Sequence, residues 1–219
     1  MTDFFREVDE DFRRDKAIEL LKRYQNWLIA AALLVILGTA AWRVYVYYQT
    51  AADEAAGGRY ETALRELQDG KVDPSIAAFE AIGRDGPKGY AALSRLIAAD
   101  AVAVKDPKAG LTAYDALISD PAYNGHLKDI AQLRAAYLRL DTDAPKEFQQ
   151  RYASLAASSQ PYRNSMRELL AVAALKGGDF PAASRWLDEI VADPAATEGL
   201  RRRADAFLAV VQAGKLPEK

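Results

Sequence analysis

The hydrophobic pattern divides the chain into two parts. Residues 24–42 form a stretch of 19 positions without a charged side chain, bounded by Arg23 and Arg43. Beyond about residue 70, apolar positions recur with a helical period and are interrupted by Pro, Gly and Asp. An α-helix rises 1.5 Å per residue, so the uncharged stretch is roughly 28 Å long, about the thickness of the hydrocarbon core of a bilayer. The pattern predicts one membrane-spanning helix followed by a larger helical domain.

Aromatic residues flank the uncharged stretch at both ends. Trp27 lies near its start, and Trp42 is followed by three tyrosines at 45, 47 and 48. Amphipathic rings prefer the headgroup level of a bilayer, and Arg43 can extend its charged group outward along its own stem. We therefore predict a transmembrane helix over 25–48. The residues expected to characterise it are Trp27, Leu28, Leu33, Leu37, Trp42 and Arg43.

Three other structures could explain the same stretch. A buried helix of a soluble protein would normally be shorter and would lack aromatic ends. A cleaved signal peptide needs a short basic leader and a small-residue cleavage site, whereas this leader exceeds twenty residues and carries seven acids. A re-entrant segment would need polar protein around it, and no other segment is apolar enough to join it in the membrane.

Flanking charges predict the orientation of the span. Five basic residues lie in the segment 13–23, but only Arg43 follows closely on the other side. Positive residues stay on the cytoplasmic side, so we expect residues 1–24 to be cytoplasmic and the chain after residue 48 to be exported. The leader has apolar residues at near-helical spacing. It is either an amphipathic docking helix or a solvated leader that only sets topology.

The exported part contains an internal repeat. Asp106–Pro121 and Asp179–Pro194 align without a gap at an offset of 73, and both end in an apolar pair followed by x-Asp-Pro. Similar aromatic or apolar pairs occur at Phe79/Ile82, Tyr114/Leu117, Tyr152/Leu155 and Leu187/Ile190, at intervals of 35, 38 and 35. Partner helices are predicted at about 88–104, 125–140, 163–176 and 197–213, the last as a cap.

Helix pairs that repeat about every 34 residues are typical of tetratricopeptide repeats. The unit Leu175–Pro194 resembles that consensus, with a Gly-Asp-aromatic turn, small residues, an aromatic and a terminal Pro. We predict an all-α fold with a degenerate tetratricopeptide-like solenoid over 71–219. It is preceded by a helical stalk, or first repeat helix, over 49–70. Gly57-Gly58 would weaken the stalk helix and is the expected hinge. An unrelated helical bundle with an accidental period is the alternative.

The composition offers little for catalysis or metal binding. The chain has no Cys, one His and a net charge of -2, which removes thiolate chemistry and any general attraction to nucleic acid. His126 lies at a helix start, and neither a Walker loop nor a His-Glu-x-x-His motif is present. Arg201-Arg202-Arg203 point in different directions on a helix and cannot form one nucleic-acid stripe. We expect no enzyme activity, cofactor, metal or small-molecule substrate.

The layout resembles the YfgM-type ancillary subunit of the SecYEG translocon. The resemblance rests on the short charged leader, the span ending in Ala41-Trp-Arg, Gly89-Tyr-Ala-Ala-Leu93, and the Lys176-Gly-Gly-Asp179 turn. It implies a bacterial inner-membrane protein whose periplasmic repeat domain associates with the translocon and with periplasmic chaperones, and assists newly exported clients. The leader of this chain is longer and more acidic than the family pattern.

A binding scaffold is therefore the predicted mechanism. Tyr90, Tyr123, Tyr137 and Tyr162 are candidate exposed anchors for a protein partner, although each could equally pack between repeats. Two other functions remain open. One is a structural subunit of another envelope complex, such as one for cytochrome maturation or envelope biogenesis. The other is an enzyme with an unrecognised site, which would need a deep polar cleft.

Overall fold

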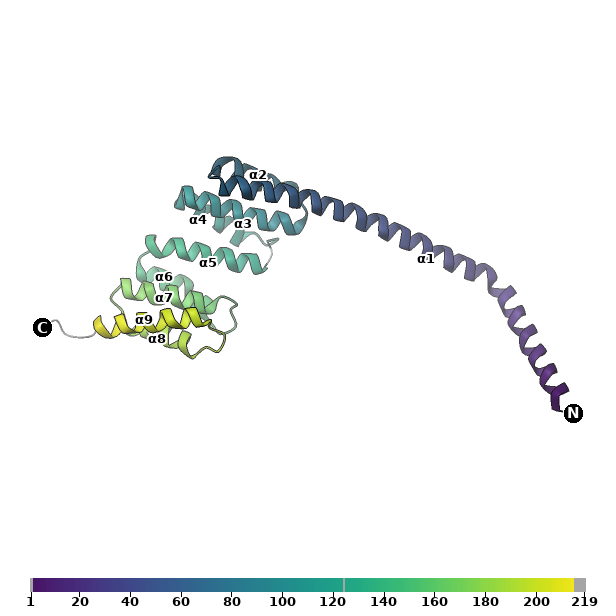
Figure 1. The fold of residues 1–219 in the computed structure, drawn as a ribbon. Coiled ribbons are helices and arrows are strands. Elements are labelled where there is room, and N and C mark those ends of the chain that lie inside the picture. The colour runs from purple at the N-terminus through teal and green to yellow at the C-terminus, as the bar shows by residue number, and fades with distance from the viewer. Residues whose placement is uncertain (1, 124, 215–219) are drawn as a thin grey trace. The chain divides into compact units, whose positions relative to one another are not determined.

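Every regular element in the described part of the chain is helical (Figure 1). The computed structural model describes the backbone of residues 2–123 and 125–214, and the side chains of 18–19, 22–123 and 125–213. The elements are α1 (Thr2–Gln68), α2 (Val72–Asp85), α3 (Lys88–Lys105), α4 (Pro107–Ser119), α5 (Gly125–Thr142), α6 (Pro145–Tyr152), a 3₁₀ turn (Ala153–Ala156), α7 (Arg163–Lys176), α8 (Phe180–Ala192) and α9 (Glu198–Gly214). The predicted all-α fold is confirmed.

The chain divides into two compact units, with the boundary between Glu54 and Ala55 inside α1. In the first unit, none of the most apolar window of α1 is buried against other described residues. Trp27 is 75% exposed, and Leu33, Leu37 and Trp42 are exposed as well. The hydroxyl of Thr39 donates to the carbonyl of Val35 at 2.7 Å, so it is satisfied within the helix. Such a helix is a candidate membrane span by length, composition and exposure.

Predicted boundaries within α1 are not marked by breaks in its backbone. The leader, span and stalk, expected at 1–24, 25–48 and 49–70, belong to one continuous helix. Among residues 1–21, only Ile18 and Glu19 have side chains that the structure describes. The amphipathic pattern of the leader therefore stays a prediction.

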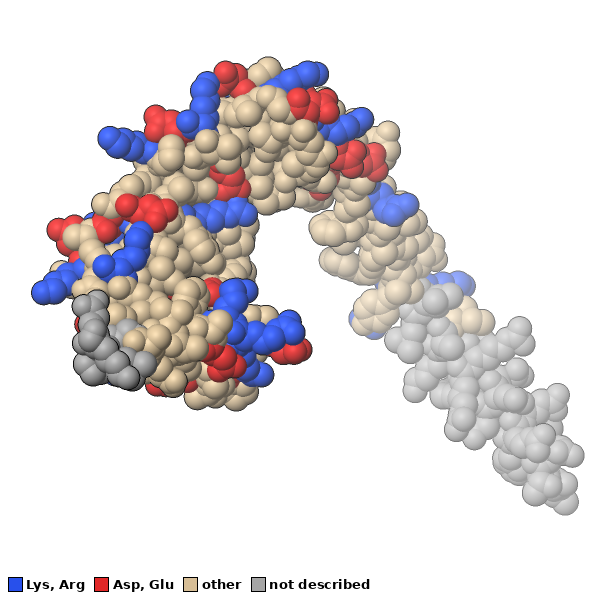
Figure 2. All heavy atoms as spheres, turned by 60° about the vertical axis from the view of Figure 1, so that its left-hand side comes forward, with Lys and Arg blue, Asp and Glu red and all other residues tan. Residues whose placement is uncertain are grey.

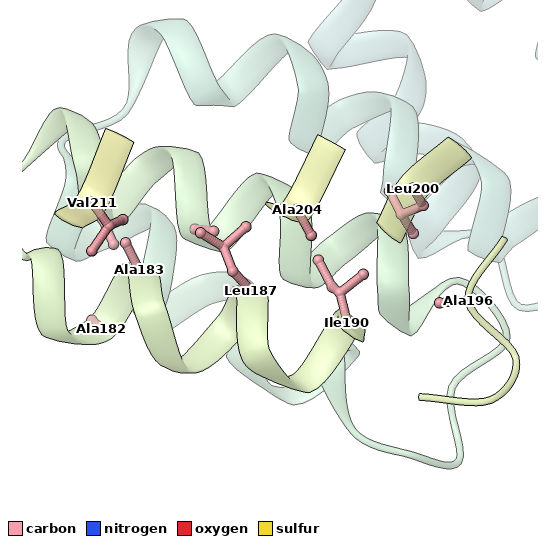
Figure 3. Close-up of a cluster of buried hydrophobic side chains, with 10 residues drawn as sticks. Ala182, Ala183, Leu187, Ile190, Ala196, Leu200, Ala204 and Val211 are labelled. Carbon is pink, nitrogen blue, oxygen red and sulfur yellow. The ribbon is translucent and has the colours of Figure 1, made fainter. Parts of the chain in front are cut away.

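The second unit is a stack of helix pairs. The end of α1 pairs with α2, α3 with α4, α5 with α6 and α7 with α8, and α9 closes the series (Figure 1). The apolar core runs through the stack as a series of clusters, each filled from three successive helices. In the last cluster, Leu187 and Ile190 of α8 face Leu200, Ala204 and Val211 of α9 (Figure 3).

The repeat read from the sequence is reproduced to the residue. Helices α4 and α8 have 13 residues each, and both bounds of α8 lie 73 positions after those of α4. The four repeat markers Phe79, Tyr114, Tyr152 and Leu187 are all buried. The helices expected at 88–104, 125–140, 163–176 and 197–213 are present with ends shifted by at most two residues.

Gly57 serves close packing in this structure. Helix α1 runs without interruption through Gly57 and Gly58, where we expected a hinge. A Cβ atom on Gly57 would lie 2.9 Å from the hydroxyl oxygen of Tyr90, so a larger residue at 57 would make the end of the tyrosine side chain shift. Tyr90 also lies against Tyr60, with ring centroids 6.0 Å apart, and Tyr60 against Phe79 at 5.4 Å. The glycine thus lets α3 approach the end of α1.

Candidate partner-binding surface

Aspartates begin and end the second helix of two repeats. Asp106 accepts hydrogen bonds from the backbone N–H groups of Lys108 and Ala109, and Asp179 accepts from that of Ala182. Such N-caps satisfy donors that have no partner within the helix. At the other end, Asp120 and Asp193 each accept from the N–H two residues on, at 2.9 Å. These bonds form the x-Asp-Pro turns that connect each repeat to the next.

The turn at Asp193 is held by two arginines of α7. Arg163 donates Nη2–H to one carboxylate oxygen of Asp193 at 2.9 Å and Nε–H to the other. Arg167 is buried and donates to the same carboxylate at 3.0 Å, and also to the carbonyl of Ala156 and the side chain of Asn164. Hydrogen bonding to Arg163 holds the pKa of Asp193 well below its usual range. The cluster is a structural brace between α7 and α8.

The basic run at 201–203 is also structural. Arg201 donates to the carbonyls of Asp193 and Pro194 at 3.0 and 3.1 Å. Arg202 lies 3.4 Å from Glu198, one turn earlier on α9. Arg203 makes a bidentate contact with Glu168 of α7 at 2.6 and 3.0 Å, which raises the pKa of the guanidinium. Arg201 and Arg203 therefore fix the capping helix to α7 and α8.

Opposite charges alternate along the first helices of successive repeats. Asp100 of α3 forms an ion pair with Arg134 of α5, and Glu168 of α7 pairs with Arg203 of α9. These four positions are 34, 34 and 35 residues apart. We call them the charge ladder. We did not predict the ladder from the sequence, although the regular spacing of these acidic and basic residues is visible there.

The four candidate tyrosines fall in different environments. Tyr123 is only 5% exposed, and its hydroxyl donates to the carbonyl of Ala92 at 2.9 Å while Arg95 lies over its ring. Of the two roles considered for Tyr123, its burial fits packing between repeats and does not fit an exposed anchor. Tyr90 is half-buried against Tyr60, and Tyr162 is half-buried next to the start of α7.

Tyr137 differs from the other three because it is 49% exposed. It lies near two ladder residues, and partial burial together with the charge of Glu168 raises its pKa. It is therefore the tyrosine of the four best placed to contact a partner from the surface of the repeat domain.

The face of the described residues that Figure 2 shows has no extended region of one charge. Acidic and basic side chains are interspersed on the face seen in Figure 2. Among the side chains that the structure describes, no group of three His, Asp or Glu residues lies close enough to hold a metal ion. An open groove of about 310 Å³ lies among α2, α3 and α4, and its lining combines small and apolar residues with the charged side chains of Glu80, Arg84 and Arg95. Its lining offers no converging carboxylates for acid–base chemistry.

Comparison with known families agrees with this architecture. Residues 19–169 match a family model described as a tetratricopeptide repeat-like domain. The match includes the apolar stretch of α1 and extends into α7, and the 73-residue offset relates the rest of the stack to it. No curated protein and no solved structure shows significant similarity to the chain. The matched residues make up more than half of the chain, which therefore belongs to the tetratricopeptide repeat-like domain family, a class of scaffolds for protein–protein interaction.

Proposed function

We propose that this protein is a membrane-anchored periplasmic scaffold of the bacterial inner membrane. Its repeat domain binds the Sec translocon and periplasmic chaperones and so assists newly exported proteins. The N-terminus is cytoplasmic in this proposal, and the chain crosses the bilayer once.

The anchor is supported by the exposed apolar stretch of α1. Burial of large apolar side chains such as Leu34 and Leu37 would stabilise the protein in a bilayer, whereas in water they remain exposed. Trp27 and Trp42 lie where the two interfaces would be, and Lys22 and Arg23 precede the stretch. These features favour a spanning helix with its N-terminus inside.

The observation that carries the proposal is the continuity of α1. The helix contains the apolar stretch and also contributes Tyr60 and Ala63 to the first core cluster of the repeat domain. The proposed anchor and the first helix of the repeat domain thus belong to the same helix in the sequence. Tethering a binding module to the membrane raises its effective concentration near a membrane-embedded partner.

Depth-dependent substitution tests the anchor. The double variant Leu33→Arg and Leu37→Arg places two charges near the centre of the span, at a cost of about 5–7 kcal/mol of insertion free energy. We expect the full-length chain to be released from membranes by alkaline extraction. The matched control, Tyr47→Arg and Tyr48→Arg, places the same charges at the interface and should leave it membrane-bound. Release of both variants, or of neither, would contradict the proposed span.

Topology and partners need a second experiment. In spheroplasts, external protease should digest the repeat domain and leave the first twenty residues protected. A photo-crosslinker at Tyr137 of the full-length protein in native membranes should capture translocon subunits and chaperones. Protection of the repeat domain would overturn the orientation. Capture of cytochrome-maturation or envelope-assembly components alone would favour the alternative role in another envelope complex.

A further inference from the structure

The first helix pair of the stack, formed by the end of α1 and by α2, has a packed side and an open side. On its packed side α3 contributes Ala98 to the shared core cluster (Figure 1). Its other side forms the N-terminal end of the stack, opposite the end that α9 closes. Residues there remain exposed, so this end of the solenoid has no helix that acts as a cap.

An open groove of about 500 Å³ lies at this end of the stack, between α1 and α2. Its lining includes five small residues and two charged ones, and the small residues are Ala55, Gly58 and Thr62 of α1 and Ala78 and Ala81 of α2. Outward faces of surface helices and of terminal repeats are usually polar and bulky. The groove instead offers a low surface on which a second helix could lie close to α1.

The groove side of α1 is the face that its own domain does not use. Ala56 and Ala63 are fully buried against the repeat domain, whereas positions 55, 58 and 62 are exposed. These three positions are spaced by three and then four residues, which is the a and d spacing of a heptad. A parallel helix that packed along α1 would therefore meet Ala55, Gly58 and Thr62 in turn. We call these three residues the seam.

Two charges beside the seam have no ion partner in the part of the chain that the structure describes. They are Glu54 and Arg59, and both are exposed. Five residues correspond to about 140° around a helix, so the two side chains do not face each other within α1. In a parallel helix pair, residues with this spacing occupy the g and e positions beside the seam and pair between chains. A second copy of α1 would thus supply the missing partner of each charge.

We propose that this groove is a self-association site, at which two copies of the chain pair in parallel along the end of α1. The inference rests on the proposed membrane span, because two copies anchored in one bilayer cross it in the same direction. Small residues then meet small residues, and Glu54 of each copy meets Arg59 of the other. The next flanking positions, Glu61 and Glu66, carry like charges, so the close contact ends near Thr62. A two-fold pair of this kind is closed.

Cysteine crosslinking tests the pairing in native membranes, because the chain contains no Cys of its own. The full-length variants Ala55→Cys and Thr62→Cys should each form a disulfide-linked homodimer on mild oxidation with copper phenanthroline. The matched control, Ala206→Cys, alters an exposed alanine of α9 at the opposite end of the stack and should stay monomeric. Equal dimer formation from position 206, or none from 55 and 62, would overturn the proposal.

Charge reversal tests the pair beside the seam. Glu54→Arg and Arg59→Glu should each weaken self-association by about tenfold, because each places like charges opposite one another. The double variant exchanges the two signs, so it should associate as the unaltered chain does. Sedimentation equilibrium of the full-length protein in detergent micelles measures all three. A double variant that associates no better than the single ones would contradict the assigned pair.

A charge within the seam gives a third measurement. Gly58→Glu places two carboxylates face to face and should abolish the homodimer formed by Ala55→Cys. A Cβ at position 58 meets no atom within 4 Å, so helical circular dichroism should not change. The control Thr112→Glu adds the same charge at an exposed position of α4 and should leave the crosslink intact. Equal losses in both variants would contradict the assignment of the seam.

Failure of the pairing and failure of the proposed function give different results. If the pairing is wrong, homodimer crosslinks at 55 are absent while crosslinks from position 137 to translocon subunits persist. If the Sec assignment is wrong, the crosslinks from 137 are absent while the homodimer still forms. A disulfide from position 55 to another protein, in place of a second copy, would also overturn the pairing.

Discussion

The pairs α3/α4 and α7/α8 share one backbone design and use different side chains to complete it. Helices α4 and α8 have the same length, begin after a capping Asp and end at an Asp-Pro turn. At equivalent positions, Gly110 and Tyr114 of α4 correspond to Ala183 and Leu187 of α8, and all four are buried. The turns at the helix ends thus determine the register, and the residues between them determine how closely the helices approach.

The pairs α3/α4 and α7/α8 pack through different side chains. A Cβ on Gly110 would lie 2.4 Å from the Cα of Ala103, so α3 and α4 are in very close contact there. Tyr114 reaches past this contact, and its hydroxyl donates to Asp100 at 2.6 Å. In α7/α8 the equivalent Leu187 ends in an apolar cluster, and polar contacts move to Asp193 and its two arginines.

The largest expected difference is between substitutions at 187 and 114. Leu187→Ala creates a cavity at a fully buried position and should lower the free energy of unfolding by about 2–5 kcal/mol. Tyr114→Phe keeps the ring and removes one hydrogen bond, so it should cost about 1 kcal/mol. Chemical denaturation followed by circular dichroism measures both. Equal costs would show that the two positions do not play the different roles assigned to them.

The next comparison exchanges the small residues of the two helices. Gly110→Ala forces backbone movement against Ala103 and should cost about 1–3 kcal/mol of unfolding free energy. Ala183→Gly makes no clash and should cost about 1 kcal/mol, through backbone entropy. The same denaturation measurement applies. A neutral or stabilising Gly110→Ala would mean that α3 and α4 are less closely packed than the structure shows.

Capping residues should give smaller and nearly equal effects. Asp106→Ala and Asp179→Ala each remove an N-cap hydrogen bond and should cost about 1 kcal/mol. Asp→Asn at either position should recover most of the loss, because the amide oxygen still accepts. Thermal melts of the four variants provide the comparison, and a loss that Asn fails to recover would indicate another role for the carboxylate.

Titration of the two turn aspartates, Asp120 and Asp193, should change the free energy of unfolding only at acid pH and hardly at all near neutral pH. The pKa of Asp120 is lowered by the N–H of Ala122 and by Arg95, and that of Asp193 by Arg163. A depressed folded-state pKa gives stability that is fully present above the unfolded value, about 3.9, and is lost as the pH falls through the folded value. Unfolding free energy should be constant above about pH 5 and fall below about pH 4.

The two turns should differ in their share of this acid sensitivity. Asp193→Asn should reduce the fall in unfolding free energy at acid pH more than Asp120→Asn does. The reason is that two guanidiniums contact Asp193 and one contacts Asp120. Denaturation at a series of pH values tests this difference. The opposite order would show that the brace at Asp193 contributes less than the single pair at Asp120.

Much of the fold could be predicted because its determinants are local. The uncharged stretch, the Asp caps, the Asp-Pro turns and the 35-residue spacing are all visible in the sequence, and the bounds predicted for α3, α5, α7 and α9 agree with the structure to within two residues. The bounds predicted within α1 are not marked in its helix. The function of Gly57 could not be predicted, because it depends on Tyr90, 33 positions away, reaching the same point in space.

The candidate surface was less predictable because its contacts also join residues that are far apart in the sequence. Burial of Tyr123 depends on its hydroxyl meeting the carbonyl of Ala92, and the basic run at 201–203 depends on Glu168 and on carbonyls at the end of α8. A residue type does not reveal such partners.

The neighbour-only packing of the helix stack also affects how the protein is made. Among α2–α9, and leaving the 3₁₀ turn out of the count, every helix packs on helices one or two along the chain. Folding therefore closes only short loops, which favours fast folding without distant contacts to wait for. As the polypeptide leaves the ribosome or a membrane channel, each helix can settle on the one before it, and a nascent chain would gain structure steadily from its N-terminal end.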